Sequence, residues 1–326
     1  MAPKSPRRKR FQFFVVHLQF KNLMIIEKIM RTNVLGTIVL LCMLAVFTSC
    51  GSKTTGNTNV KESTVEQFEP DTRFATIDTL ADFMTQNLFD HTTDELVAHV
   101  DTQAAAMKSY WYLNHKGGDE SRIDEDVCND LKVLADSLSG GSTVDMEQSN
   151  EITCAIARYL TAKEYCNNHI KNSLYQAEMH DWLLLEDELQ AFYTDLAQLA
   201  NWGGSISRVT GSGALSFLAK VRQEDYSKLK KGSSFADEEE MTVEEARTNL
   251  IQELEDAKSL EDDMGAGDDF NKTLESMRLH ADKVVGLLDK WLASRVQLCE
   301  AEGIPTKHNA HLVAKLGQRI MELIEG

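Results

Sequence analysis

Proline is almost absent from the longer, C-terminal part of this chain of 326 residues. From residue 50 onward the only prolines are Pro70 and Pro305. Because proline removes a backbone donor and clashes with the preceding helical turn, its scarcity leaves long segments free to be helical. Alanine, leucine, glutamate and lysine, which favour helices, are frequent there. The sequence therefore predicts an all-α fold, a multi-helix bundle with long antiparallel helices.

Apolar residues recur at helical spacing along residues 71–326, which we predict to form one helical domain. Capping boxes that begin at Thr92 and Thr242 indicate two helix starts. The glycine-rich segment 202–213 is interpreted as a helix end and a turn, because no lysine follows it as a phosphate-binding loop requires. The expected helices are 80–88, 92–115, about 127–138, 146–202 with a break near 167–168, 214–229, 242–260, 269–302 and 309–324.

The N-terminal residues 1–49 have the features of a secretory signal peptide rather than of a folded domain. Met30 and Arg31 precede an apolar run from Val34 to Phe47. This run is shorter than the roughly 20 residues that a membrane-spanning helix needs, and it matches the hydrophobic core of a signal peptide. We expect translation to start at Met24 or Met30.

The segment that follows the apolar run, Thr48-Ser49-Cys50-Gly51, resembles the lipobox of bacterial lipoproteins. It differs from the family pattern in having Phe47 where leucine is preferred and Ser49 in place of glycine or alanine. The resemblance implies lipidation of Cys50, with diacylglyceryl and acyl chains such as palmitate. Residues 50–70 are then a lipid-anchored flexible tether, and residues 71–326 a periplasmic domain.

The residue after Cys50 indicates which membrane carries the lipid anchor. Gly51 is not the aspartate that, in the lipoprotein family, retains proteins in the inner membrane. The resemblance therefore implies an outer-membrane anchor that faces the periplasm. The alternative location is the cell surface, although no acidic run of the kind found in some surface lipoproteins follows Cys50.

Residues 50–326 are strongly acidic. The first 49 residues hold eight of the 34 basic and one of the 51 acidic residues, so the remainder has a formal net charge of −24. A nucleic-acid-binding protein needs a basic face, so nucleic acid is excluded as a partner. The charge suits a cationic partner and also favours solubility.

Four cysteines remain after Cys50, namely Cys128, Cys154, Cys166 and Cys299. An even number in an oxidising compartment predicts two disulfides, for which three connectivities are possible. No zinc-binding CxxC or HExxH pattern is present, and we expect neither a metal nor a cofactor. His308 and His311 are interpreted as surface residues, and the acidic run 237–240 as a solvated loop.

One helix carries a clear apolar stripe with an unexpected arginine. Its members share one face because they are three or four residues apart: Leu274, Met277, Ala281, Val284, Leu288, Trp291, Arg295 and Cys299. A guanidinium on such a face is costly without a partner. The stripe therefore predicts that Arg295 is a partly buried charge with a specific partner.

The segment from Trp291 through Arg295 to Cys299 resembles the C-terminal signature of lysozyme-inhibitor-like periplasmic proteins. A weaker likeness to the same family lies in Glu151-Ile152-Thr153-Cys154. Family members place the two motifs well under a hundred residues apart, whereas Cys154 and Cys299 are 145 apart. The resemblance implies a helical, disulfide-bonded protein with Trp291 and Arg295 at a binding or structural site.

No catalytic constellation is evident in the sequence, so we expect a protein that is not an enzyme. The preferred function is a lipid-anchored periplasmic binding protein whose partner is a cationic protein such as lysozyme. One alternative is a cell-envelope hydrolase that uses paired carboxylates, since two buried carboxylates facing a cleft can hydrolyse glycosidic bonds. Another is a structural envelope lipoprotein.

Overall fold

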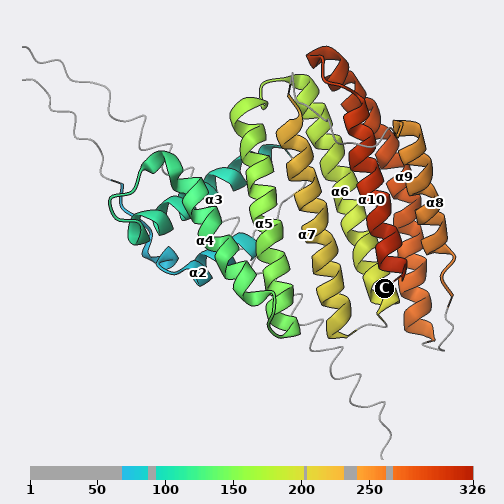
Figure 1. The fold of residues 1–326 in the computed structure, drawn as a ribbon, viewed down its shortest axis with the longest axis horizontal. Coiled ribbons are helices and arrows are strands. Elements are labelled where there is room, and N and C mark those ends of the chain that lie inside the picture. Colours follow the sequence, from blue (N-terminus) through green and yellow to red (C-terminus); the bar gives the residue numbers. More distant parts are fainter. Residues whose placement is uncertain (1–67, 87–92, 202–203, 231–240, 262–266, 326) are drawn as a thin grey trace, which may run out of the picture. The chain divides into compact units, whose positions relative to one another are not determined.

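The computed structural model describes residues 68–86, 93–201, 204–230, 241–261 and 267–325. All regular structure in these ranges is helical, as the sequence predicts (Figure 1). The described residues belong to one compact unit, 67–326. The predicted signal peptide, Cys50, most of the predicted tether and the acidic run 237–240 lie outside the described residues.

Within the described ranges the chain forms two short 3-10 helices, η1 and η2, and nine α-helices. In chain order they are η1 (Thr72–Phe74), α2 (Ile77–Gln86), α3 (Thr93–Asn114), η2 (Glu120–Arg122), α4 (Ile123–Leu138), α5 (Thr143–Asn168), α6 (Ser173–Ala200), α7 (Ser205–Lys228), α8 (Val243–Lys258), α9 (Asp268–Glu302) and α10 (Lys307–Glu325). None of them combines the length and the apolar character that a bilayer-spanning segment requires.

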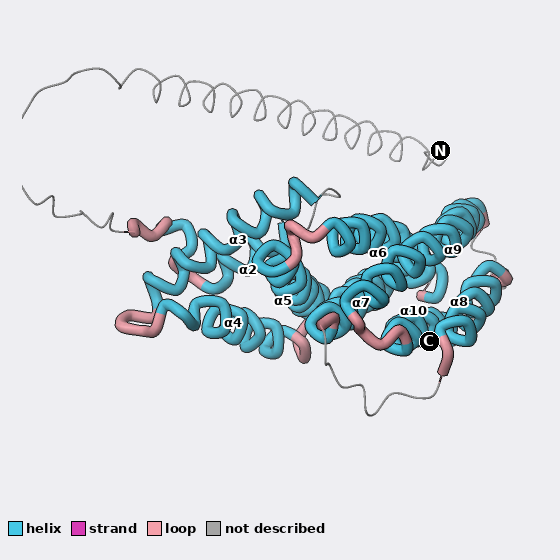
Figure 2. Tube along the Cα trace, turned by 90° about the horizontal axis from the view of Figure 1, so that it is seen from above, coloured by secondary structure: helices cyan, strands magenta, loops and turns pink. Residues whose placement is uncertain are grey.

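The long helices pack against one another. Helix α7 contacts both α5 and α6, α9 packs along α6, and α8 packs along α10 (Figures 1 and 2). Helices α2, α3 and α4 pack against one another and against α5. Helices α6 to α10 thus form a bundle. Helix α5 packs against α7 and against α2, α3 and α4, and so connects these three helices to the bundle.

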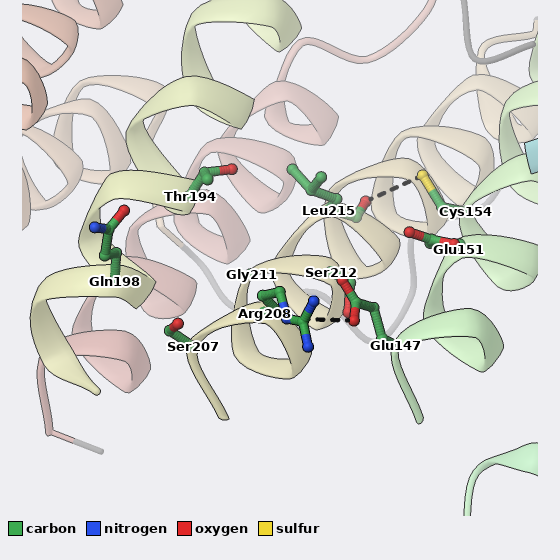
Figure 3. Close-up of a pocket in the computed structure, with 10 residues that line it drawn as sticks. All are labelled: Glu147, Glu151, Cys154, Thr194, Gln198, Ser207, Arg208, Gly211, Ser212 and Leu215. Carbon is green, nitrogen blue, oxygen red and sulfur yellow. Dashed lines mark hydrogen bonds and ion pairs between the residues drawn. The ribbon is translucent and has the colours of Figure 1, made fainter. Parts of the chain in front are cut away.

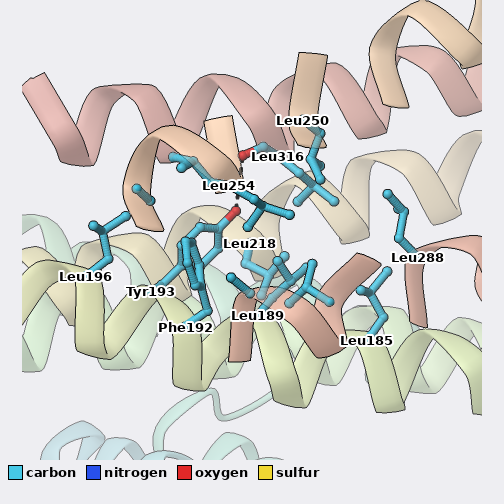
Figure 4. Packing of buried hydrophobic residues seen from close by; sticks show 14 of the residues in the cluster. Leu185, Leu189, Phe192, Tyr193, Leu196, Leu218, Leu250, Leu254, Leu288 and Leu316 are labelled. Carbon is cyan, nitrogen blue, oxygen red and sulfur yellow. Dashed lines mark hydrogen bonds between the residues drawn. The ribbon is translucent and has the colours of Figure 1, made fainter. Parts of the chain in front are cut away.

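Two apolar cores fill these packed layers. One core lies among α6 to α10, and Figure 4 shows leucines of α6, α7, α8, α9 and α10 in this core together with Phe192 and Tyr193 of α6. The hydroxyl of the fully buried Tyr193 donates a hydrogen bond to the backbone carbonyl of Leu316, 3.2 Å away. The second core gathers α2 to α5 with the start of α6 and the ends of α7 and α9.

Local capping signals account for several helix boundaries. The side chain of Thr242 caps α8 in a capping box with Glu245, which confirms the predicted start. Helix α5 starts at Thr143, earlier than the predicted Met146, because Ser142 and Asp145 form another capping box. The predicted break near 167–168 is confirmed, and Asn172 caps the start of α6.

The interpretation of the glycine-rich segment 202–213 as a turn is wrong for most of its length. Helix α7 begins at Ser205, directly after Gly204, whose φ of 88° suits glycine. Gly211 and Gly213 lie inside the helix. At Gly211 an added Cβ would lie 3.8 Å from the Cβ of Ala197 on α6, which is an ordinary van der Waals contact. Packing between helices overrides the low helix propensity of glycine here.

A glycine also sets the distance between α8 and α10. A Cβ on Gly317 would lie 3.2 Å from the Cα of Leu250, closer than side chains normally approach a backbone atom. Gly286 on α9 is the opposite case, because an added Cβ would meet nothing within 4 Å.

We therefore expect substitutions at these two helical glycines to have opposite effects. Gly317→Val should cost about 1–3 kcal/mol because α10 is pushed away from α8. Gly286→Ala should stabilise the protein by up to about 1 kcal/mol, the difference in helix propensity. Chemical denaturation of both variants checks the pair. Equal effects of the two substitutions would contradict the close packing of α8 on α10.

Candidate functional site

The two residues singled out by the sequence, Trp291 and Arg295, lie in the middle of the bundle. Both side chains are fully buried, and so is every other member of the stripe on α9. The guanidinium of Arg295 donates to Glu178 at 2.9 Å and to Asp225 at 2.7 Å. Its Nε donates to the side-chain oxygen of Asn309 at 3.1 Å. The prediction that Arg295 has a specific partner is confirmed, but its side chain is fully buried and not partly buried as predicted.

A second arginine completes this arrangement. Arg222 of α7 lies 2.8 Å from Glu178 and 3.0 Å from Asp225, and its side chain is also buried. We call Glu178, Arg222, Asp225 and Arg295 the buried ionic cluster. It contains two carboxylates and two guanidiniums, so its formal charges balance. Its members come from α6, α7 and α9.

Neutral and titratable neighbours surround the cluster. The indole nitrogen of Trp291 donates to Glu178 at 2.8 Å, and Nε2 of His308 lies 3.0 Å from Asp225. The interpretation of His308 as a surface residue is wrong, because α10 buries this side chain against Asp225. Its position on α10 brings a fourth helix to the cluster.

The environment keeps both carboxylates of the cluster ionised. Burial by itself raises the pKa of Glu178, but the neighbouring Arg222 and Arg295 more than offset this, so its pKa lies below the usual range. The pKa of Asp225 is also strongly lowered, because Arg295 and the hydrogen bond from His308 outweigh burial. Burial opposes a charged Arg295, yet Asp225 and Glu178 raise its pKa.

This burial defines what Trp291 and Arg295 can do. A side chain with no exposed surface cannot contact a protein partner unless the bundle opens. The resemblance to lysozyme-inhibitor-like proteins rests mainly on these side chains, which are structural in this fold. The arginine ties helices together instead of presenting a charge to a partner.

The predicted disulfides are absent, because all four described cysteines are free thiols. The four side chains face different neighbours. Cys154 donates to the carbonyl of Leu215 on α7 at 3.7 Å, and Cys299 approaches Asn309 on α10 at 3.9 Å. Cys128 and Cys166 lie half-buried at the edge of the second core. Burial raises the pKa of the Cys154 thiol to about 11, so it is protonated and unreactive at neutral pH.

A cavity of about 280 Å³ lies between α5, α6 and α7. This volume is close to the lower limit of small-molecule sites, which span about 300–1,000 Å³. Figure 3 shows the side chains of the three helices around it. The lining residues are Glu147, Glu151 and Cys154 of α5, Thr194 and Gln198 of α6, and Ser207, Arg208, Gly211, Ser212 and Leu215 of α7.

Small residues on α7 create this space. Ser207 and Gly211 are one helical turn apart, so neither fills the region between the three helices. The opposite wall carries Glu147 and Glu151, which are also one turn apart on α5. Sequence analysis missed this site. Its signal was the run of small residues after Gly204, which we interpreted as a turn.

The charges that line the cavity are only partly paired. Arg208 lies 3.7 Å from Glu147, and its side chain is 60% exposed. Burial, and then the charge of Glu147, raise the pKa of Glu151. Glu151 therefore carries its negative charge at some cost, which a bound cation would relieve.

Two other cavities are less suited to a ligand. One, of about 220 Å³ between α8 and α10, is lined by apolar and amide side chains with Glu253 as its carboxylate. The other, of about 20 Å³ beside Arg158 and Glu186, has room for about one water molecule. Among the described residues no group of histidine, cysteine, aspartate and glutamate side chains is arranged to hold a metal ion.

Comparison with known proteins finds no matching family model, no similar curated protein and no similar solved structure.

The buried ionic cluster generates a stability prediction. Arg295→Ala should cost about 3–5 kcal/mol, because Glu178 and Asp225 would lose a buried partner. Arg295→Lys should restore only part of this loss, since an ammonium cannot reproduce the planar fork that bridges two carboxylates. Thermal unfolding followed by circular dichroism measures both effects.

Arg278, an exposed arginine on the same helix, is the control. Arg278→Ala should cost less than about 1 kcal/mol. A melting temperature for Arg295→Ala equal to that of Arg278→Ala would show that the cluster does not stabilise the fold.

Proposed function

We propose that this chain is a non-enzymatic, lipid-anchored binding protein of the cell envelope that holds a small ligand in the cavity between α5, α6 and α7. The observation that carries the proposal is the cavity itself, whose walls combine carboxylates, hydroxyls and an amide at metabolite size. A few polar groups that converge on a pocket are typical of ligand sites.

The arrangement of the carboxylates favours binding over hydrolysis. Glycoside hydrolases place two carboxyl groups on opposite sides of the bond to be cleaved. Glu147 and Glu151 instead lie on one helix and form one wall. The cavity also offers a poor nucleophile, because the Cys154 thiol is buried with a raised pKa. The paired-carboxylate hydrolase is therefore the weaker alternative.

Attachment outside the cytoplasm is supported by the sequence features before residue 51. The apolar run, followed by Cys50, matches a lipoprotein signal, and the polar segment up to Pro70 is suited to a tether. We place the domain at the periplasmic face of the outer membrane, with the cell surface as the alternative. A purely structural envelope lipoprotein would not need the cavity.

A cationic protein such as lysozyme is a second candidate partner, and its only support is net charge. Residues 50–326 hold 26 basic and 50 acidic residues, a formal net charge of −24. Such a charge speeds encounter with basic proteins without making it specific. Trp291 and Arg295 lend this candidate no support, because both are buried.

The anchor is tested by replacing its cysteine. Cys50→Ser should abolish incorporation of a clickable fatty acid and move the protein from the membrane to the soluble or secreted fraction. Cys42→Ser, a change inside the apolar run, is the matched control and should keep both the label and the membrane location. Equal labelling of Cys50→Ser and wild type would contradict the lipid anchor.

The cavity is tested by closing its mouth. Thr194 is exposed at the rim, so Thr194→Trp should cover the opening without disturbing the core. Ala177→Trp, at an exposed position of α6 outside the cavity, is the control. Saturation-transfer NMR against a mixture of amino-acid-sized polar metabolites should detect binding to wild type and Ala177→Trp, with at least a ten-fold weaker signal for Thr194→Trp. Absence of any binding to the wild type would remove the proposal.

A further inference from the structure

We propose that the ligand of the cavity is an organic ammonium ion, a primary alkylamine of metabolite size, whose amine is held by the carboxylates of Glu151 and Glu147. The inference rests on the proposed function, and it specifies the chemistry that the walls select.

The hydroxyl and thiol protons along the cavity are already donated to acceptors within the protein. The hydroxyls of Thr194 and Ser207 donate to the carbonyls of Gln190 and Gly204, both at 2.8 Å. Ser212 donates to its own helix, and Cys154 donates to Leu215 across to α7. Oxygen atoms whose protons are committed can only accept further hydrogen bonds. These groups thus offer a ligand acceptors and not donors.

The walls of the cavity carry more negative than positive charge. The charged or titratable lining groups are Glu147, Glu151 and Cys154 of α5 and Arg208 of α7, whereas α6 contributes only the neutral Thr194 and Gln198. Arg208 is directed to Glu147, as Figure 3 shows. No hydrogen bond or ion pair joins Glu151 to another side chain in the part of the chain that the structure describes. One negative charge on the wall is therefore uncompensated.

An ammonium ion satisfies both conditions. It carries three donors and no acceptor, which matches the carboxylates of Glu147 and Glu151 and the acceptor oxygens of the lining hydroxyls. The donors of the lining, the Gln198 amide and the Arg208 guanidinium, belong to exposed side chains. The ammonium also supplies the positive countercharge for the carboxylate of Glu151. A carboxylate ligand would bring another negative charge beside Glu147 and Glu151. Arg208, the cation of the lining, is already directed to Glu147.

The state of Glu151 provides an independent readout. Burial and the charge of Glu147 raise its pKa in the free protein. Because the folded state holds this proton more tightly than the unfolded chain does, ionisation of Glu151 destabilises the fold as the pH rises above the usual range of a glutamate. A bound ammonium favours the ionised form, so binding near that pH should release a proton and lower the pKa of Glu151.

The experiment uses three probes of the same length on the purified full chain in detergent: 1,4-diaminobutane, 1,4-butanediol and succinate. Titration calorimetry should detect diaminobutane and give no measurable heat for the diol or succinate. Repeating the titration in buffers of different ionisation enthalpy should show proton release on binding of the diamine. Thr194→Trp should weaken binding of the diamine, because it should weaken binding of any ligand in this cavity.

Glu151→Gln is the decisive variant. Loss of a charge-assisted hydrogen bond should lower the affinity for diaminobutane about ten-fold or more. The proton release on binding should also disappear. Its melting temperature should equal or exceed that of the wild type, because a costly charge has been removed, so weaker binding will not reflect unfolding. Glu164→Gln, at an exposed position of the same helix, should change neither property.

The outcomes separate the ligand class from the function. Binding of succinate or of the diol, blocked by Thr194→Trp, without binding of the diamine would overturn the ammonium assignment and leave the binding protein intact. Diamine binding that survives Glu151→Gln would place the amine elsewhere and overturn the assignment as well. If the diamine and the metabolite mixture both fail to bind, the ammonium assignment and the proposed function fall together.

Discussion

The buried ionic cluster is the interaction on which the arrangement of the long helices depends. Glu178, Arg222, Asp225 and Arg295 have almost no access to solvent, so each charge must find its partner inside the protein. The pairs lie at 2.7 to 3.0 Å and join α6, α7 and α9. A shift of one helix along another would leave a charge unpaired at a cost of several kcal/mol. The cluster therefore restricts the register of these helices, in addition to the fit of their apolar side chains.

The same requirement positions the cavity. Its walls are α5, α6 and α7, and buried ion pairs hold all three. Glu178 and Arg222 join α6 to α7 at 2.8 Å, while Arg158 and Glu186 join α5 to α6 at 2.7 Å. Because these ion pairs hold the helix axes at fixed distances, α7 cannot move closer to α5 and α6 along its whole length to fill the volume that its small side chains leave. A space remains beside Gly211, and the carboxylates of α5 face it.

Sequence reasoning reached part of this structure through periodicity. The stripe on α9 predicted that Arg295 would be partly buried and paired, because the other residues of the stripe are apolar. It could not show that Glu178 and Asp225 would be the partners, since these lie 117 and 70 residues away in the chain. The disulfide prediction failed for a related reason. An even number of cysteines says nothing about which helix faces they occupy, and the four thiols face different neighbours.

What the sequence determined by itself was the helical class, most helix boundaries and the buried face of α9, because proline content, capping boxes and spacing act over one or two helical turns. It also carried the apolar run and Cys50 that predict a lipid anchor. Only the tertiary structure decided that the glycine-rich segment continues as a helix, that His308 is buried, and that Glu147 and Glu151 face small residues of α7 across a cavity. These features depend on contacts between helices distant in the chain, whose register is set by matching buried charges and side-chain volumes rather than by local preference.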